Sequence, residues 1–267
     1  FLAYDDRMGR EVAIKTLDTL ALKDPSVASE MVERFRREAK TLARISHPHL
    51  VTLFEIGSHQ SQHYMVMEYV KGSPLSRFVA ARQKLSSTLV ASIGKQMCDA
   101  LERIHQEQII HRDIKPANMI LSEKGVVKLT DFGVARCHRN NDTRLTQAGA
   151  LMGTLLYCAP EQIQNASTVD ARADIYALGM SLYELLSHQS PYRGRHIAQV
   201  ALEITSDQPT SGTLKTHVPD LPDSLVHIIE KALAKNPEDR FPDARSMGEV
   251  LDLFIQRHLT QKKIHFC

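Results

Sequence analysis

The chain has 267 residues, of which 43% are hydrophobic and 24% charged, and its formal net charge is +2. This is ordinary globular usage and excludes a fibrous or a disordered protein. Basic and acidic residues are interleaved, so the charge favours neither nucleic acid nor an anionic membrane as a partner. No stretch reads as a membrane span or as a signal peptide.

The four cysteines lie far apart and form no Cys-x-x-Cys pair: they are Cys98, Cys137, Cys158 and Cys267. Scattered cysteines of this kind are usually reduced thiols, so we expect a cytoplasmic domain. A membrane anchor elsewhere in a longer protein would be compatible with this expectation.

The first seventy residues show mostly strand patterns. Strands are predicted over residues 11–17, 51–56 and 64–70, and a turn at 7–10 precedes the first of them. Residues 30–45 predict a helix with Phe35, Ala39 and Leu42 on one face. Residues 71–74, Lys-Gly-Ser-Pro, then break the chain.

Helical patterns dominate the rest. An apolar stripe at helical spacing is formed by Leu89, Ile93, Met97, Leu101 and Ile104. Residues 174–186 are apolar nearly all round, which predicts a central, buried helix. The switch predicts an α+β fold with a small β-rich lobe at 1–70, a larger helical lobe at 71–267 and a hinge near 68–72. Clefts between such lobes are favoured ligand sites.

The strongest chemical signal is the run His-Arg-Asp-Ile-Lys-Pro-Ala-Asn at 111–118, followed by Asp-Phe-Gly at 131–133. Phosphoryl transfer asks a protein mainly for positioning and for charge neutralisation. Asp113 is a candidate to orient an attacking hydroxyl, and Lys115 places a positive charge near the transferred phosphoryl group. Asn118 offers an amide oxygen, a ligand that suits Mg²⁺.

Two short apolar strands, at 119–121 and 126–129, flank a turn at 123–125. This hairpin would carry the chain back, so that Asp131 arrives beside Asn118. Two oxygen ligands could then hold Mg²⁺, or Mn²⁺, where it bridges the phosphates of ATP.

Four motifs occur in one order: Val-Ala-Ile-Lys at 12–15, His-Arg-Asp at 111–113, Asp-Phe-Gly at 131–133 and Ala-Pro-Glu at 159–161. In this the chain resembles a eukaryotic-type (Hanks-type) Ser/Thr protein kinase catalytic domain, closest in style to bacterial members. The resemblance runs from residue 1 to about residue 255.

The resemblance implies roles for the charged residues. Lys15 would hold the α- and β-phosphates of ATP, with Glu38 as its ion-pair partner; the alternative for Glu38 is a solvated position on a charged helix face. Asp113 would be the catalytic base, while Asn118 and Asp131 would bind the metal. The alternative for each of these is a buried structural residue.

The resemblance also implies an adenine site and two structural contacts. Adenine would lie between Ala13 and Ile120. The backbones of Glu68 and Val70 would offer it hydrogen bonds at the hinge, and Met67 would be the gatekeeper side chain behind them. Asp174 would cap the backbone of the catalytic loop, and Glu161 would pair with Arg240.

The Lys-Pro pair at 115–116 fits kinases that modify Ser or Thr in proteins, since tyrosine kinases typically have Ala-Ala-Arg in this loop. Thr154 is similar to the threonine that bonds the catalytic Asp and Lys in the Ser/Thr class. Leu151, Leu155 and Cys158 would line an apolar pocket for the residue after the phosphoacceptor.

Three arginines, Arg34, Arg112 and Arg136, match positions that contact a phosphate on the activation segment. Thr146 is the leading candidate to carry this phosphate, and Thr143 is the second. Autophosphorylation is the expected route, through a homodimer of kinase domains acting in trans. The alternative is a pair of solvated loop threonines in a segment that is active without modification.

The resemblance lacks one part. Residues 1–10 contain a single glycine, Gly9. The first strand, and the glycine-rich loop that covers the phosphates, would therefore stand before Phe1 in a longer protein.

Two alternative functions would each change the sequence in a recognisable way. A pseudokinase or scaffold module usually loses the lysine, the catalytic Asp or the metal Asp, and all three are present. A small-molecule kinase of related fold would lack the long segment from Asp131 to Glu161.

Overall fold

The computed structural model describes residues 1–17, 25–60, 62–131, 153–165, 169–192, 194, 196–206 and 214–264. Within this range, the side chains outside the description are those at 25–28, 30, 34, 38, 41 and 261–264.

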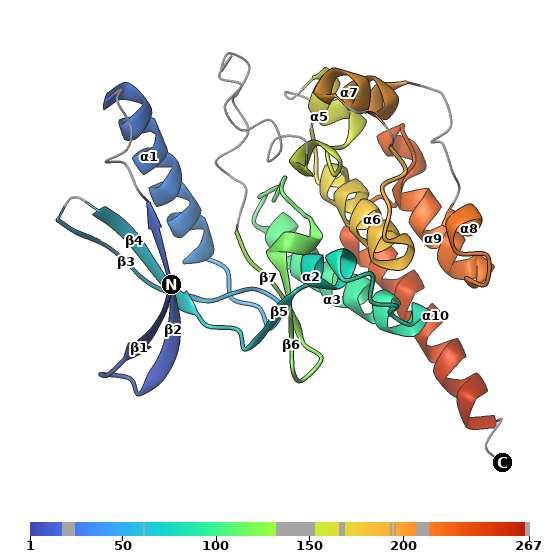
Figure 1. The fold of residues 1–267 in the computed structure, drawn as a ribbon, viewed down its shortest axis with the longest axis horizontal. Coiled ribbons are helices and arrows are strands. Elements are labelled where there is room, and N and C mark those ends of the chain that lie inside the picture. The colour runs from blue at the N-terminus through green and yellow to red at the C-terminus, as the bar shows by residue number, and fades with distance from the viewer. Residues whose placement is uncertain are drawn as a thin grey trace.

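The N-terminal lobe is a four-stranded antiparallel sheet with one helix, α1 (Pro25–Leu42), packed on it (Figure 1). The strands have the order β1-β2-β4-β3 and are β1 (Leu2–Asp5), β2 (Arg10–Leu17), β3 (Leu53–His59) and β4 (Gln62–Glu68). The buried face of α1 carries Phe35, Ala39 and Leu42, the three residues predicted to share it.

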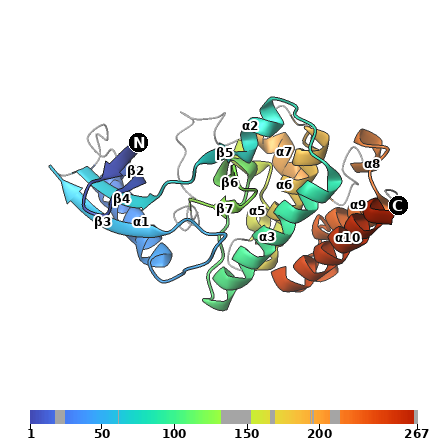
Figure 2. The ribbon, with the colours of Figure 1, turned by 90° about the horizontal axis from the view of Figure 1, so that it is seen from below.

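The C-terminal lobe is mainly helical and contains a small three-stranded sheet of order β5-β6-β7 (Figure 2). Its strands are β5 (Gly72–Pro74), β6 (Met119–Ser122) and β7 (Val127–Leu129). Its α-helices are α2 (Leu75–Ala80), α3 (Ser87–Gln106), α5 (Pro160–Gln164), α6 (Arg172–Ser187), α7 (Ile197–Thr205), α8 (Leu214–His217), α9 (Asp223–Ala232) and α10 (Ala244–Ile264). Short 3-10 turns are η1 (Pro116–Asn118) and η4 (Pro237–Asp239).

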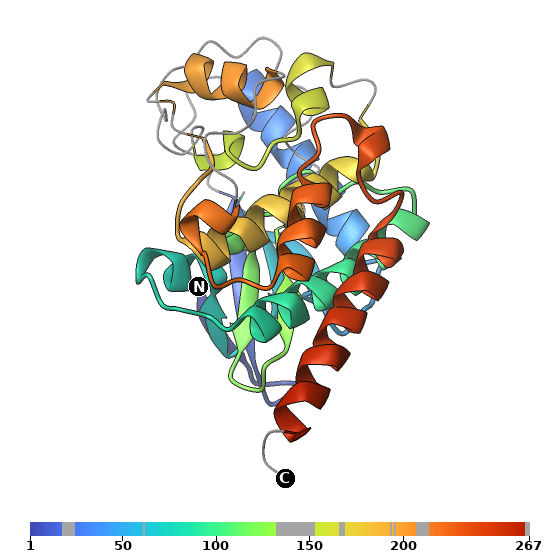
Figure 3. The ribbon, with the colours of Figure 1, turned by 90° about the vertical axis from the view of Figure 1, so that its right-hand side faces the viewer.

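Helix α6 is the centre of this lobe, as its apolar sequence predicted. Thirteen of its residues are buried, and α3 and α9 pack against it. Helix α10 lies alongside α3 at the outside of the lobe (Figure 3). Gly94 allows the close approach of these helices, since a Cβ there would lie 2.9 Å from a Leu182 methyl carbon and 3.0 Å from one of Leu251.

The segment between α1 and β3 joins the two lobes a second time, beside the covalent connection. The Val51 amide donates to the Leu129 carbonyl at 3.0 Å, and the Leu129 amide donates to the His49 carbonyl at 2.9 Å. Strand β7 is therefore tied directly to the N-terminal lobe just before it reaches Asp131.

The predicted α+β, two-lobed fold is confirmed, with shifted element ends. Helix α1 begins at Pro25 rather than at residue 30, where a proline fits because the first helical amides need no intrahelical acceptor. Strand β3 continues to His59 and β4 begins at Gln62, and the polar side chains at these strand ends hid the strand pattern. The boundary predicted between residues 70 and 71 falls between β4 and β5. Among the described helices, none combines the length and apolarity of a membrane span.

Candidate active site

The predicted catalytic loop, residues 111–118, is held by the buried carboxylate of Asp174 in α6. Asp174 Oδ2 accepts the His111 amide and Oδ1 accepts the Arg112 amide, both at 2.8 Å. Arg112 has a φ of +62°, a left-handed conformation that costs free energy in a non-glycine residue. The cap predicted for Asp174 is confirmed, and it stabilises a strained turn beside Asp113.

A histidine that the sequence did not single out completes this cap. His105 Nε2 in α3 lies 2.9 Å from Asp174 Oδ2. Burial alone would raise the pKa of Asp174, but its bonds from His105 and the Arg112 amide hold that pKa below its usual range. Nothing in the sequence sets His105 apart from the other histidines of this chain, since it lies in no motif.

Asp113 lies in a tight polar cluster and is only 8% exposed. Its Oδ1 is 3.0 Å from Lys115 Nζ, and its Oδ2 is 2.9 Å from Asn118 Nδ2. Asn118 Nδ2 also donates to the Asp113 carbonyl at 2.8 Å. Lys115 Nζ reaches Thr154 Oγ1 at 3.4 Å, so the loop is joined to the segment that precedes α5.

The hairpin of β6 and β7 brings Asp131 to Asn118, as predicted. In these strands, Met119 pairs with Leu129 and Leu121 pairs with Val127. The Thr130 amide then donates to the Asn118 carbonyl at 2.9 Å. The next residue is Asp131, which has a φ of +55° and turns out of the strand.

Lys15 in β2 reaches across the cleft to Asp131. Its Nζ lies 2.6 Å from Asp131 Oδ1, and the two side chains are 35% and 43% exposed. The sequence predicted a different partner, Glu38, whose side chain lies outside the described residues; its backbone belongs to α1. This pair was not predicted, and it joins the lysine expected to bind the phosphates to the carboxylate expected to bind the metal.

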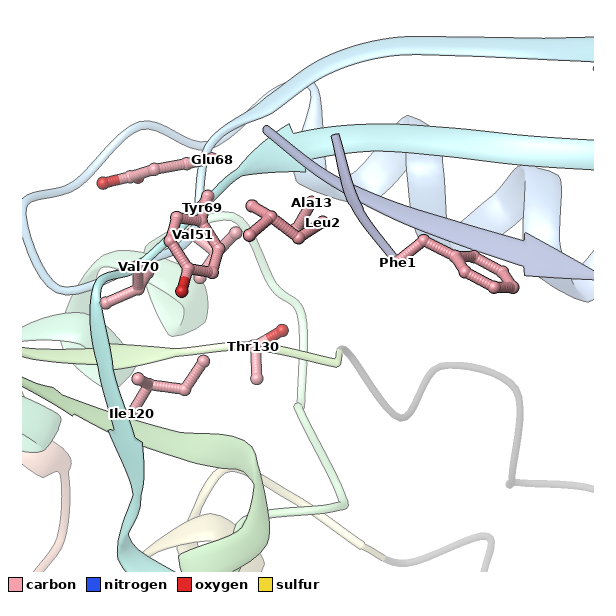
Figure 4. A pocket seen from close by; sticks show the side chains of 9 residues that line it. All are labelled: Phe1, Leu2, Ala13, Val51, Glu68, Tyr69, Val70, Ile120 and Thr130. Carbon is pink, nitrogen blue, oxygen red and sulfur yellow. The ribbon is translucent and has the colours of Figure 1, made fainter. Parts of the chain in front are cut away.

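A cavity of about 280 Å³ lies between the lobes, beside this point (Figure 4). Ala13 and Leu2 lie on one side of it, and Ile120 and Thr130 lie on the other. The remaining lining residues are Phe1, Val51, Glu68, Tyr69 and Val70. Four of the five residues predicted to surround adenine therefore share one cavity. The fifth, Met67, is buried next to it and pairs with Ala13 in the sheet.

Glu161 and Arg240 form the predicted ion pair. Arg240 Nη1 and Nη2 donate to the two Glu161 carboxylate oxygens at 2.7 and 2.8 Å, and the Arg240 side chain has no exposed surface. The pair anchors α5, and with it the segment that carries Thr154.

The regulatory prediction falls largely outside the described residues. Arg136, Thr143 and Thr146 lie in the stretch 132–152, and the Arg34 side chain is also not described. Arg112 is the member of this set whose side chain is described, and it lies next to Asp113 in the capped turn.

The sequence of this chain is similar to those of known proteins. A model of the protein kinase domain matches residues 1–250. The chain belongs to the protein kinase family. It is 39% identical over 92% of its length to a probable serine/threonine-protein kinase of Streptomyces coelicolor. It is 35% identical over 98% of its length to serine/threonine-protein kinase PrkC of Bacillus subtilis, and 38% identical over 92% to PknB of Mycolicibacterium smegmatis.

These comparisons confirm the predicted family, its Ser/Thr class and its similarity to bacterial members. The kinase chain spans between 36% and 39% of the length of these three relatives. The family uses ATP and a divalent metal, and its members modify proteins.

Proposed function

We propose that this kinase domain transfers the γ-phosphoryl group of ATP to Ser or Thr hydroxyls of protein substrates. The observation that carries the proposal is the cluster around Asp113. A nearly buried carboxylate is fixed there by Lys115 and Asn118 on a strained, capped loop, and Lys115 also bonds to Thr154. Such fixed geometry is what phosphoryl transfer asks of a protein.

In the proposed reaction, Asp113 accepts a hydrogen bond from the substrate hydroxyl and orients its oxygen toward the γ-phosphorus. The oxygen–phosphorus bond forms as the bond to the β-phosphate oxygen breaks, and ADP leaves. The hydroxyl proton passes to the Asp113 carboxylate. Lys115 stabilises negative charge on the transferred group, and Thr154 positions Lys115.

The cavity between the lobes supports the adenine site. Its two faces are apolar, with Ala13 and Ile120 opposite each other (Figure 4), which suits a flat aromatic base. The backbone at Glu68 and Val70 supplies hinge hydrogen bonds, and Met67 closes the space behind them. Lys15 binds the α- and β-phosphates, and Glu38 holds Lys15 when the site is assembled.

The donor set fits Mg²⁺, and Mn²⁺ would fit it as well. Asn118 uses its Nδ2 for two bonds to Asp113, and its Oδ1 would serve as one oxygen ligand of the metal. The half-exposed Asp131 carboxylate supplies the second hard ligand. When bound, the metal neutralises charge on the phosphates.

Regulation by autophosphorylation belongs to the same proposal. A phosphate on Thr146, or on Thr143, would attract Arg112, Arg136 and Arg34 and order the segment through charge-assisted bonds. A homodimer of kinase domains would allow transfer in trans. Cys98 is a buried thiol, and the wide spacing of the cysteines along the chain supports the cytoplasmic location that we propose.

The test is an assay of the full-length protein with radiolabelled ATP, Mg²⁺ and generic protein substrates, followed by phosphoamino acid analysis. We expect phosphoserine and phosphothreonine, and loss of both in Lys15→Met and Asp131→Asn variants. Nucleotide binding without transfer would indicate the pseudokinase alternative instead. Phosphosite mapping of wild type and a Thr143→Ala/Thr146→Ala variant tests the regulatory part; full activity of that variant would refute it.

A further inference from the structure

One ion pair beside the cavity has no place in the reaction described above. Glu68, the last residue of β4, has its Oε2 2.9 Å from the Nζ of Lys128 in β7. The two side chains are 28% and 17% exposed. A pair this deep is screened less by salt than one on the open surface.

Both partners also hold the segment that joins the lobes. Glu68 Oε2 accepts the Thr52 amide at 3.2 Å, and Lys128 Nζ donates to the Leu50 carbonyl at 3.3 Å. The Glu68 amide donates to the Thr52 carbonyl at 2.8 Å. The hinge end of β4, the segment 50–52 and β7 are thus tied at one point, which we call the hinge clamp.

The hinge clamp adjoins three residues that line the cavity. Val51 lies between the two clamp residues Leu50 and Thr52, Glu68 is itself a member, and Thr130 follows Lys128 by two positions. The Glu68 side chain points away from Phe1, on the far side of the cavity (Figure 4). Its carboxylate bonds to the Thr52 amide and to Lys128, so it would act on the cavity wall.

The same tie extends to the phosphate end of the site. Asp131 follows Lys128 by three residues along the chain, and β7 is bonded to His49 and Val51 through Leu129. A shift of β7 against the hinge would move the metal-binding carboxylate relative to the adenine wall. The hinge clamp therefore connects the wall of the cavity to the strand that leads to Asp131.

We propose that Glu68 and Lys128 are positioning residues for ATP, acting through the hinge clamp on the cavity wall. This inference rests on the proposed function. Removing one charge would leave the other half-buried without its partner, which is costly. The clamp would loosen, and ATP would have to order it on binding.

The experiment compares full-length wild type with Glu68→Gln, Lys128→Met and the double variant. Glu68→Gln keeps an oxygen for the Thr52 amide and removes only the charge. We expect each single variant to raise the KM and the Kd for ATP by about fivefold, with a smaller change in kcat. The double variant should show no further loss, because the two residues act as one unit.

Arg103→Gln is the matched control. Arg103 and Glu107 form a pair of 2.7 Å in α3, with side chains 31% and 40% exposed, away from the cavity. It should leave the KM for ATP unchanged. Melting temperatures of all variants report any loss of folding.

The outcomes separate clearly. A fall in melting temperature with unchanged KM and Kd would overturn the inference, because the pair would then be merely structural. Additive effects in the double variant, or a rise in kcat with unchanged KM, would also overturn it. A wild-type protein that binds no ATP would instead overturn the proposed function itself.

Discussion

Arg240 is the most consequential structural cation in the described part of the chain, and its removal gives a sharp prediction. Besides Glu161, its guanidinium donates to three carbonyls: those of Ala234 at 2.8 Å, Lys235 at 3.0 Å and Arg172 at 3.1 Å. The Arg240→Met variant would leave these acceptors without their donor and Glu161 without its counter-charge.

The magnitude follows from these contacts. Each lost neutral hydrogen bond costs about 1 kcal/mol, and breaking a buried ion pair by removing one partner costs roughly 3–5 kcal/mol in all. Because the Arg240 side chain is fully buried, we expect the upper end, about 5 kcal/mol. For a domain of this size, that lowers the melting temperature by about 15 °C.

The assay is urea unfolding of the full-length protein and of Arg240→Met, followed by circular dichroism and by a transfer assay. Arg245→Gln is the control, since Arg245 and Glu249 are 68% and 65% exposed and such pairs contribute about 1 kcal/mol or less. A destabilisation in Arg240→Met no larger than that of the control would refute the reasoning.

Three further predictions concern the cap, the N-terminal sheet and pH. Asp174→Asn should lower kcat about tenfold or more, because the bonds to the catalytic-loop amides weaken; unchanged turnover would contradict the cap's role. Gly57→Ala should destabilise the protein by about 1 kcal/mol in urea unfolding, because a Cβ would lie under 2.5 Å from the Tyr64 hydroxyl; the loss should vanish in a Tyr64→Ala background. Burial lowers the pKa of His47 from its ordinary value, so its neutral form is favoured in the fold. The contribution of His47 to the free energy of unfolding is therefore fully present above about pH 6.5, and it is lost as the pH falls below that value. The free energy of unfolding should differ less between pH 7.5 and pH 5.5 for His47→Gln than for wild type. An equal difference in the two proteins would show that His47 is not the source of this pH dependence.

The sequence predicted those parts of the site that depend on short spacing along the chain. Asp113 and Asn118 are five residues apart on one loop, and the hairpin between Met119 and Leu129 returns the chain over a fixed length. Local geometry alone brings these residues together. The long-range pair of Glu161 and Arg240 was predicted only because the motif order identified the family.

Contacts across the cleft could not be predicted in the same way. The bond between Lys15 and Asp131 and the bond between Glu68 and Lys128 each join the two lobes, and they depend on how the lobes are placed. The hydrophobic periodicity of the strands that carry these residues does not predict how the lobes are placed. His105 was missed for a related reason, since its role comes from the approach of α3 to α6.

The account rests on Asp113 as the residue that orients the attacking hydroxyl, and its isosteric variant is the most direct test. Asp113→Asn should bind ATP within about twofold of wild type, because in the proposed reaction this side chain would contact the hydroxyl and not the nucleotide. Its phosphate transfer should fall by about a thousandfold, as expected for loss of one group that acts in the transition state. An Asp113→Asn protein with wild-type turnover would contradict the central claim.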